Sequence, residues 1–368
     1  MTRTRKVLGV ILILVAVMVL SLGIILSHDS ACGPAPALPS NATPMKAIVH
    51  RCYGAPDVLK LEDIEKPTPE DNQVLVKVHA ASINPLEWHY MRGKPYIMRM
   101  EAGLGAPTNP RFGVDYAGTV EAVGKDVKRF KPGDEVFGGR TGALAEYVAV
   151  REDRAIVLKP ANVTFEQAAS VPIAAVTALQ ALRDKGRIQA GQKVLINGAS
   201  GGVGTFAVQI AKSFGADVTG VCSTRNVDMV RSLGADRVID YTKEDFTKGD
   251  QVYDLIVDNV GNHSLRDYTR VLKPKGIFVI VGGPNEGSWI GAMTIPIKAK
   301  LLSPFVSQEM VFFLADLSPE DLTVLADLMQ TGKLTPVIDR TYKLSDTPAA
   351  IGYLEEGHAR GKVVIGLE

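Results

Sequence analysis

With 368 residues, the chain is long enough for more than one domain and for a core that needs no covalent or metal cross-links. Its 41 lysines and arginines nearly balance 40 aspartates and glutamates, and a formal net charge of +1 at pH 7 gives no support for a nucleic-acid partner. Cys32, Cys52 and Cys222 have neither an even count nor metal-ligand spacing, so we expect no disulfide framework and no cysteine-rich zinc lobe.

The first predicted element is an apolar segment at the amino end. Val7 to Leu26 contains no charged residue, follows three basic residues and is long enough to cross the hydrocarbon core of a bilayer as a helix. A secretory signal usually has a shorter apolar region, so we interpret residues 1–28 as an uncleaved membrane anchor, with a cleaved signal as the alternative. Residues 29–44 are rich in proline and alanine and lack periodicity, which predicts a tether.

A mostly β region follows the tether. From Met45, apolar and polar residues alternate with a period of two, as in antiparallel strands with one solvated face. Glycine, proline and asparagine residues between the runs indicate turns. Further strands are predicted at Gly118 to Val123, Asp134 to Phe137, Ala145 to Val150 and Ala155 to Leu158.

The stretch from Lys193 to Gly215 predicts a buried strand, a glycine-rich turn and an amphipathic helix. Glycines in the turn omit the β-carbons, so the N–H groups at the start of the helix can approach an anion that the helix dipole favours. A pyrophosphate is the predicted ligand, and a plain tight turn is the alternative. The predicted cradle consists of Gly198, Ser200, Gly201, Gly202, Val203 and Gly204.

Strand and helix patterns alternate after this turn. Strands are predicted at Asp217 to Cys222, Arg237 to Asp240, Tyr253 to Asn259 and Ile277 to Val281, and helices near Asn226 to Leu233 and at His263 to Leu272. Repeated units of this length imply an α/β fold with a doubly wound parallel sheet, whose ligands sit at the carboxyl ends of the strands. The apolar run from Ala299 to Phe313 is predicted to supply the last strand, a helix is predicted at Pro319 to Gln330, and the final residues are predicted to return a strand to the first domain.

Several ordered motifs carry a family resemblance. They are ASINPLEWHYMRG from Ala81, GVDYAGTVEAVG from Gly113, FKPGDEVFG from Phe130, AEYVAV from Ala145, SVPIAAVTALQAL from Ser170, NGASGGVG from Asn197 and ARGKVVI from Ala359. In order and spacing they resemble the zinc-free quinone oxidoreductase branch of the medium-chain dehydrogenase/reductase superfamily, including its mitochondrial reticulon-interacting type. The resemblance implies a GroES-like, partly open β-barrel catalytic domain over residues 45–165, completed by residues 316–368. It also implies a Rossmann domain over residues 166–315 and a homodimer through the last strand of that domain.

The position of a catalytic metal is altered in this chain. Zinc-containing relatives have a Gly-His-Glu motif where this chain has Gly113, Val114 and Asp115, so the histidine ligand is missing. A catalytic zinc needs three protein ligands and an open position, and we therefore expect no metal. Asp115 is interpreted as a carboxylate that forms internal hydrogen bonds near the cleft.

The end of the second Rossmann strand favours NADPH over NADH. NAD-selective folds place a carboxylate there for the ribose 2′-hydroxyl, whereas this chain has Cys222 followed by Ser223 and Arg225. A hydroxyl and a guanidinium could hold a 2′-phosphate; the alternative is that Arg225 is a solvated residue that opens the next helix. Two later strand ends are predicted to wall the nicotinamide, through Asn259, Val260, Gly282 and Gly283, unless their glycines only permit turns.

Without zinc, a simple alcohol or ketone lacks its Lewis acid. We therefore expect a quinone or an α,β-unsaturated carbonyl (enone), whose acceptor is activated by conjugation and needs mainly positioning and a hydrogen-bond donor. Asn84 matches the active-site asparagine of the resembling family. Tyr90 or Tyr96 is a candidate proton donor, with a packing role as the alternative for each. Trp88 and His89 are candidate pocket residues, but a structural role is the favoured interpretation of His89 as a lone histidine.

Two questions stay open at this point. The basic residues precede the apolar span, so the positive-inside bias places the main body outside the cytoplasm, whereas a nicotinamide nucleotide is chiefly an intracellular reagent. The activity also has alternatives, namely an enoyl-thioester reductase that depends on a tyrosine and a nucleotide-binding regulatory or structural protein at the membrane.

Overall fold

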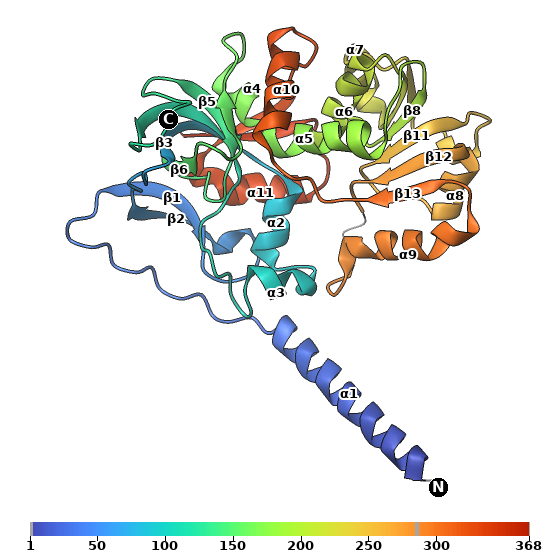
Figure 1. The fold of residues 1–368 in the computed structure, drawn as a ribbon, viewed down its shortest axis with the longest axis horizontal. Helices are drawn as coiled ribbons and strands as arrows, with labels where there is room; N and C mark the ends of the chain where they lie inside the picture. Colours follow the sequence, from blue (N-terminus) through green and yellow to red (C-terminus); the bar gives the residue numbers. More distant parts are fainter. Residues whose placement is uncertain (1–2, 284–286, 368) are drawn as a thin grey trace.

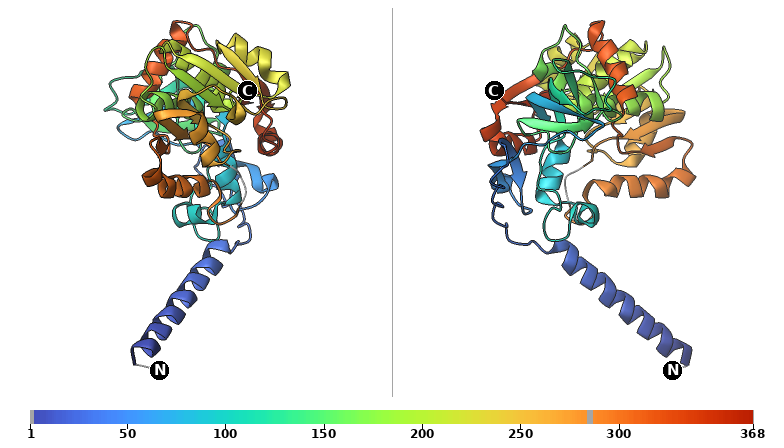
Figure 2. Two further views of the ribbon diagram at one scale, coloured as in Figure 1. Left: turned by 90° about the vertical axis from the view of Figure 1, so that its right-hand side faces the viewer. Right: turned by 60° about the vertical axis from the view of Figure 1, so that its left-hand side comes forward.

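The computed structural model describes residues 3–283 and 287–367 and consists of a protruding amino-terminal helix and two packed domains (Figure 1). Helix α1, Arg3–Ser27, extends away from the rest of the molecule in every view (Figures 1 and 2). Its segment Val10–Ser27 has a mean hydropathy of 3.1 and is 6% buried. By length and composition this helix could cross a membrane. A signal sequence near the amino end can meet the same criteria of length and apolar composition.

The segment after α1 forms no helix or strand, but its first residues are attached to the GroES-like domain. Asp29 forms an ion pair with Arg99, and the Ser30 N–H donates to the Gly105 carbonyl at 2.8 Å. Cys32 is joined to Cys52 by a disulfide with its Cα atoms 4.7 Å apart. The expectation that the cysteines form no disulfide is therefore wrong for this pair, because the fold brings together two residues whose spacing gave no signal. Cys222 is a buried free thiol.

The GroES-like domain contains a two-stranded and a seven-stranded sheet. Strands β1 (Pro44–His50) and β2 (Leu59–Glu65) pair antiparallel, and the larger sheet has the order β14-β15-β3-β4-β5-β7, with β6 paired to β3. Its strands are β3 (Gln73–Ile83), β4 (Asp115–Val123), β5 (Glu135–Gly139), β6 (Tyr147–Arg151), β7 (Ile156–Leu158), β14 (Ile338–Lys343) and β15 (Lys362–Gly366). The predicted return of the carboxyl end is confirmed, because β15 pairs antiparallel with β3 and places Val363 opposite Ile83.

Short helices cover the ends of this sheet. Helix α2 (Pro85–Arg92) follows β3 directly, and the 3-10 turn η2 (Tyr96–Met98) and α3 (Arg99–Ala102) lie beyond it, at the end of the domain next to the carboxyl end of α1 (Figure 1). Helices α10 (Pro319–Gln330) and α11 (Thr347–Glu355) belong to the carboxyl-terminal part. The predicted bounds of α10 are confirmed, since Ser318 caps it and Pro319 occupies its first turn.

The Rossmann domain has a six-stranded, wholly parallel sheet with the order β10-β9-β8-β11-β12-β13. Its strands are β8 (Lys193–Asn197), β9 (Asp217–Cys222), β10 (Arg237–Asp240), β11 (Tyr253–Asp258), β12 (Leu272–Ile280) and β13 (Glu309–Phe312). The predicted single strand from Ala299 to Phe313 is wrong in its first part, where helix α9 (Thr294–Leu302) precedes the short β13.

Alternate strand residues face two separate hydrophobic cores, as a doubly wound sheet requires. Val194 and Ile196 of β8 face the core that contains α5 (Pro172–Gln180) and α6 (Gly202–Ser213). Leu195 faces the other core, with Tyr268 of α8 (Leu265–Val271) and with α9. The remaining helices are α4 (Phe165–Ala169) and α7 (Val227–Ser232).

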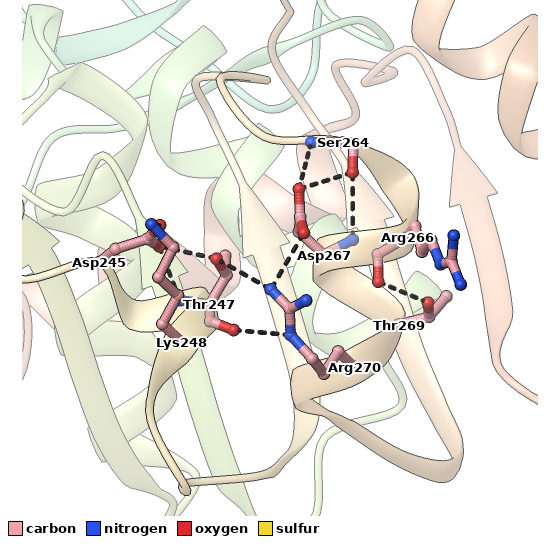
Figure 3. A network of polar contacts seen from close by, with 8 residues as sticks. All are labelled: Asp245, Thr247, Lys248, Ser264, Arg266, Asp267, Thr269 and Arg270. Atoms are coloured by element: carbon pink, nitrogen blue, oxygen red, sulfur yellow. Dashed lines mark hydrogen bonds and ion pairs between the residues drawn. The ribbon is translucent and has the colours of Figure 1, made fainter.

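A polar network fixes the start of α8 (Figure 3). Ser264 and Asp267 form a reciprocal capping box, and Arg270 pairs with Asp267 and donates to the Thr247 carbonyl at 3.0 Å. The helix therefore begins at Leu265 rather than at the predicted His263, because Ser264 takes the capping position.

Candidate active site

The glycine-rich turn follows β8 and opens α6, and two of its glycines meet specific steric requirements. Gly198 has a φ of +77°, and a β-carbon there would lie 2.8 Å from Val260 Cγ2. A β-carbon on Gly204 would collide with the Gly198 carbonyl, so only glycine lets α6 pack this closely against its own turn. Gly201 precedes α6, and no described side chain caps this helix. The first-turn N–H groups, which begin with Gly202 and Val203, are therefore left for an anionic ligand.

A second cluster lies beside the turn at the end of β9. The Asn226 amide donates to the hydroxyls of both Ser200 and Ser223, at 3.1 and 3.2 Å. Asn226 is 4% exposed, and its Oδ1 has no partner among the described residues. Arg225 is exposed, and one of its guanidinium nitrogens donates to the His358 carbonyl at 2.7 Å. Hydrogen bonds thus join Asn226 to Ser200 and Ser223, with Arg225 next to Asn226 in the chain, and Asn226 is the residue of this cluster that the sequence prediction did not include.

The carboxylate of Asp240, which lies near the end of β9, already accepts hydrogen bonds from neighbouring side chains. Its oxygens accept from the Thr224 hydroxyl at 2.6 Å and the Thr242 hydroxyl at 2.7 Å, and these hydrogen bonds hold its pKa below the ordinary value. Asp240 is the last residue of the adjacent strand β10 and pairs with Cys222 in the sheet, so a carboxylate does lie beside the end of β9, although not on β9 itself, and the preference for NADPH stays a prediction.

The ends of β11 and β12 meet next to the turn. The Asn259 amide donates to the Asn197 carbonyl at 2.9 Å, while its Oδ1 is buried with no partner in the described part of the chain. Val260 is partly exposed beside Gly198, and a β-carbon on Gly282 would collide with the Asn259 carbonyl. The structure therefore brings Asn259, Val260 and Gly282 together beside the glycine-rich turn, with Gly283 following Gly282 along the same loop, and their role around the nicotinamide stays a prediction.

Asn84 forms the centre of a buried polar network between β3, β4 and β15. Its amide nitrogen donates to Asp115 at 2.9 Å, and its amide oxygen accepts a short hydrogen bond from Lys362. Lys362 also lies 3.6 Å from Asp115 and donates to the Ile83 carbonyl at 3.2 Å. Asp115 accepts from Ser82 at 3.1 Å and from the Ile173 N–H at 3.0 Å. The prediction that Asp115 forms internal hydrogen bonds is confirmed, while Lys362 was missed.

Burial controls the protonation of this network. It raises the pKa of Asp115 and lowers the pKa of Lys362, and the attraction between the two charges opposes both shifts. Glu87, at the start of α2, accepts from the Asn84 N–H at 2.9 Å, and its other oxygen has no partner among the described residues. Burial, together with the negative charge of Asp115, raises the pKa of Glu87 to about 7.

A cavity of about 370 Å³ opens beside α2. Its described lining comes from α2, the segment after it, the loop after β12 and the end of α11: Trp88, His89, Arg92, Lys94, Pro95, Gly287, Ser288, Gly291 and Glu355. His89 stacks on Trp88 with ring centroids 3.7 Å apart, and its Nδ1 lies 2.9 Å from the Lys94 carbonyl. Burial lowers the pKa of His89. Both candidate pocket residues therefore do line a cavity.

The two candidate tyrosines lie elsewhere. Neither Tyr90 nor Tyr96 is among the described residues that line this cavity, and the buried network of Asn84, Asp115 and Lys362 does not line it either. The guanidinium of Arg99 lies over the Tyr96 ring at 4.7 Å and over the Tyr53 ring at 4.3 Å. Burial and the nearby charge of Glu101 raise the pKa of Tyr90. This arrangement favours the packing alternative for Tyr96, and catalysis by either tyrosine stays a prediction.

The position at which zinc-containing relatives bind their metal, Gly113 to Asp115, has no cluster of metal ligands among the described residues. Among residues 3–283 and 287–367, no group of three His, Cys, Asp or Glu side chains is arranged to hold an ion. Val114, between Gly113 and Asp115, has no atom that could ligate zinc.

Comparison with known proteins agrees with this architecture. A family described as "Alcohol dehydrogenase GroES-like domain" matches residues 70–161, and one described as "Zinc-binding dehydrogenase" matches residues 233–365. The mouse "NAD(P)H oxidoreductase RTN4IP1, mitochondrial" (Mus musculus) is 36% identical over 364 residues, covering 89% of this chain and 90% of the relative. The chain belongs to the medium-chain dehydrogenase/reductase superfamily.

Other relatives place it within the quinone oxidoreductase-like part of that superfamily. The "NADPH-dependent alkenal/one oxidoreductase, chloroplastic" of Arabidopsis thaliana is 37% identical over 336 residues, covering 87% of this chain and 79% of the relative. A solved quinone oxidoreductase from Coxiella burnetii superposes with a TM-score of 0.76 at 34% identity and covers 89% of this chain and 100% of its own. This medium-chain dehydrogenase/reductase is therefore an NAD(P)H-dependent oxidoreductase.

Proposed function

We propose that this enzyme is a zinc-independent, NADPH-dependent reductase of quinones or α,β-unsaturated carbonyls. The observation that carries the proposal is the buried network of Asn84, Asp115 and Lys362, which lies against the glycine-rich turn. A β-carbon on Gly202 would lie 3.4 Å from Lys362 Cδ, and the Gly361 N–H donates to the Ser200 carbonyl at 2.9 Å. The polar residues of one domain are thus attached to the nucleotide cradle of the other.

The residues present fit a dinucleotide. The glycine-rich turn leaves room for a pyrophosphate, and the buried Oδ1 atoms of Asn226 and Asn259 have no hydrogen-bond partner among the described residues, so donors of a bound nucleotide would satisfy them. Ser223 and Arg225 would hold the 2′-phosphate of NADPH. When bound, the nicotinamide supplies the hydride.

The network orients a donor for the substrate carbonyl. An amide carries two N–H donors, and Asn84 commits one of them to Asp115. Lys362 holds the amide oxygen, so the remaining N–H has a fixed direction, and the buried ammonium favours negative charge that develops on a nearby carbonyl oxygen. A conjugated acceptor needs this orientation and no Lewis acid.

We also propose that α1 anchors the enzyme in a membrane and that the exposed side of β13 pairs with a second copy. Strand β13 is the edge of the parallel sheet, where unpaired backbone groups are available to another strand. The positive-inside bias and the Cys32–Cys52 disulfide both support an extracytoplasmic body, since disulfides persist in oxidising compartments. That location requires a supply of NADPH on the same side.

NADPH consumption by the full chain tests the proposed reaction. We expect turnover with quinones or enones and none with saturated ketones. Asn84→Ala should reduce kcat more than it raises KM for NADPH, because it removes a substrate contact and leaves the glycine-rich turn unchanged. Tight NADPH binding without turnover of any acceptor would instead support the regulatory alternative, and dependence on an enoyl thioester and a tyrosine would support the thioester reductase.

A further inference from the structure

The side of the molecule from which α1 leaves carries exposed apolar side chains. On α9 and the turn after it, Ile297, Leu301 and Phe305 recur at every fourth residue and are 46%, 69% and 83% exposed. Such side chains are normally buried, and a stripe at this spacing is one face of a helical segment. The exposed Lys298 and Lys300 lie on the same helix, so α9 combines an apolar stripe with basic residues.

A second group of exposed apolar side chains lies near the carboxyl end of α1. Ile97 and Met100, from η2 and α3, are exposed, as are Leu104 and Trp289. Helices α3 and α9 lie on the side of the body that faces α1 in each view (Figures 1 and 2). We call the two groups together the lower surface, made up of Ile97, Met100, Leu104, Trp289, Ile297, Leu301 and Phe305.

The end of α1 is attached to this surface. A β-carbon on Gly23 would lie 3.3 Å from the Trp289 ring. Arg99, which is 1% exposed, donates to the carbonyls of Leu26 and His28 at 3.1 and 3.0 Å, so a cation satisfies the carboxyl end of the helix. Because the apolar segment of α1 reaches Ser27, a bilayer around it would begin where the lower surface lies.

The loop that carries Trp289 also forms a wall of the cavity. The Tyr96 N–H donates to the Ser288 carbonyl at 2.7 Å, and the Tyr96 ring lies 5.1 Å from that of Trp289. A β-carbon on Gly291 would lie 3.4 Å from Pro95, and Gly291, Ser288 and Pro95 all line the cavity. A cavity wall and the lower surface are thus parts of one short loop.

We propose that the lower surface rests in the headgroup region of an anionic bilayer and that the cavity takes its substrate, a quinone or enone with a long apolar tail, from the lipid. This inference rests on the proposed function for the substrate class and on α1 as an anchor for the position of the bilayer. Apolar side chains would enter the acyl boundary, Lys298 and Lys300 would meet anionic headgroups, and Trp289 would occupy the interface.

The position of Trp289 is measured in the full chain reconstituted into nanodiscs of brominated phosphatidylcholine and phosphatidylglycerol. The chain has two tryptophans, so the comparison of the native protein with Trp289→Phe isolates the signal of this residue from that of Trp88. We expect the brominated lipid to quench a component that Trp289→Phe lacks. Equal quenching of both proteins would overturn the proposal.

The route of the substrate is measured in the same nanodiscs with two acceptors, a long-chain quinone in the bilayer and a short water-soluble enone. The combined variant Ile297→Ser, Leu301→Ser and Phe305→Ser should lower kcat/KM for the bilayer quinone by about tenfold or more and leave the enone unchanged. Val324→Ser, which removes an exposed apolar side chain from α10 at the other end of the body, is the matched control and should change neither.

The remaining outcomes separate this inference from the proposed function. If the combined variant loses kcat/KM equally on both acceptors, the lipid contact is overturned and the stripe is assigned to folding. If the molecular mass of the assembly changes in this variant, the lipid contact is likewise overturned and the stripe is assigned to contact with a second copy. If the native chain turns over neither acceptor, the proposed reaction fails, while lipid quenching of Trp289 would still support the contact.

Discussion

Glu87 is expected to make the stability of the GroES-like domain depend on pH. The side chain is 3% exposed, one of its oxygens has no partner among the described residues, and its pKa is raised from 4.5 to about 7. A raised carboxyl pKa means that the folded state binds a proton more tightly than the unfolded state. Its contribution to stability is therefore fully present below pH 4.5 and is lost as the pH rises through about 7.

The size of this loss follows from the shift in pKa. A difference of about 2.5 pKa units corresponds to roughly 3 kcal/mol of unfolding free energy. Glu87→Gln removes the ionisation and keeps an oxygen that can accept from the Asn84 N–H. The variant should therefore become more stable relative to the native protein as the pH rises, by about 3 kcal/mol in total or about 5 °C in melting temperature for a body of this size.

Thermal unfolding of both proteins in mild detergent, across this pH range, measures the effect. Glu320→Gln is the matched control, because Glu320 also lies in the first turn of a helix but is exposed. It should follow the native protein at every pH. If the melting temperatures of the native protein and Glu87→Gln differ by the same amount at every pH, the assignment of a buried, protonated Glu87 is refuted.

Three further predictions concern the cofactor site and the tether. Arg225→Ala should weaken NADPH binding about tenfold or more without changing NADH binding, and an unchanged ratio in titrations of both nucleotides would remove the 2′-phosphate assignment. Gly204→Val should abolish binding of both nucleotides in the same titrations, because its β-carbon would collide with the Gly198 carbonyl; retained affinity would show that the turn is not the cradle. Cys32→Ser should lower stability by about 3 kcal/mol, and the native Cys32 and Cys52 should react with a maleimide only after reduction.

Local patterns were sufficient to predict much of the fold. Strand β9 and helix α10 have their predicted bounds, because alternation, caps and turn residues act over a few positions. The region before β13 was misinterpreted, since an apolar run without clear periodicity fits a helix as well as a strand, and Thr294–Leu302 is helical.

Residues of the candidate site could be proposed from the sequence where they lie in a local motif. Gly198 and Gly204 were identified from the turn, and Asn84 from a family resemblance. Lys362 was not, because its bond to Asn84 joins residues 278 positions apart and exists only when β15 pairs with β3. The Cys32–Cys52 disulfide was missed for a different reason, since Cys32 lies in a segment without regular structure whose path the sequence pattern does not predict.

The central claim is that the chain transfers a hydride from NADPH to a conjugated acceptor without a metal. The most direct test is turnover of the full chain, dialysed against a chelator, with NADPH deuterated at the transferable position of the nicotinamide and an enone acceptor. The proposed function predicts a reduced product that carries deuterium at its β-carbon, at a rate that added zinc does not change. A reaction that appears only when zinc is restored, or a product without deuterium, would contradict it.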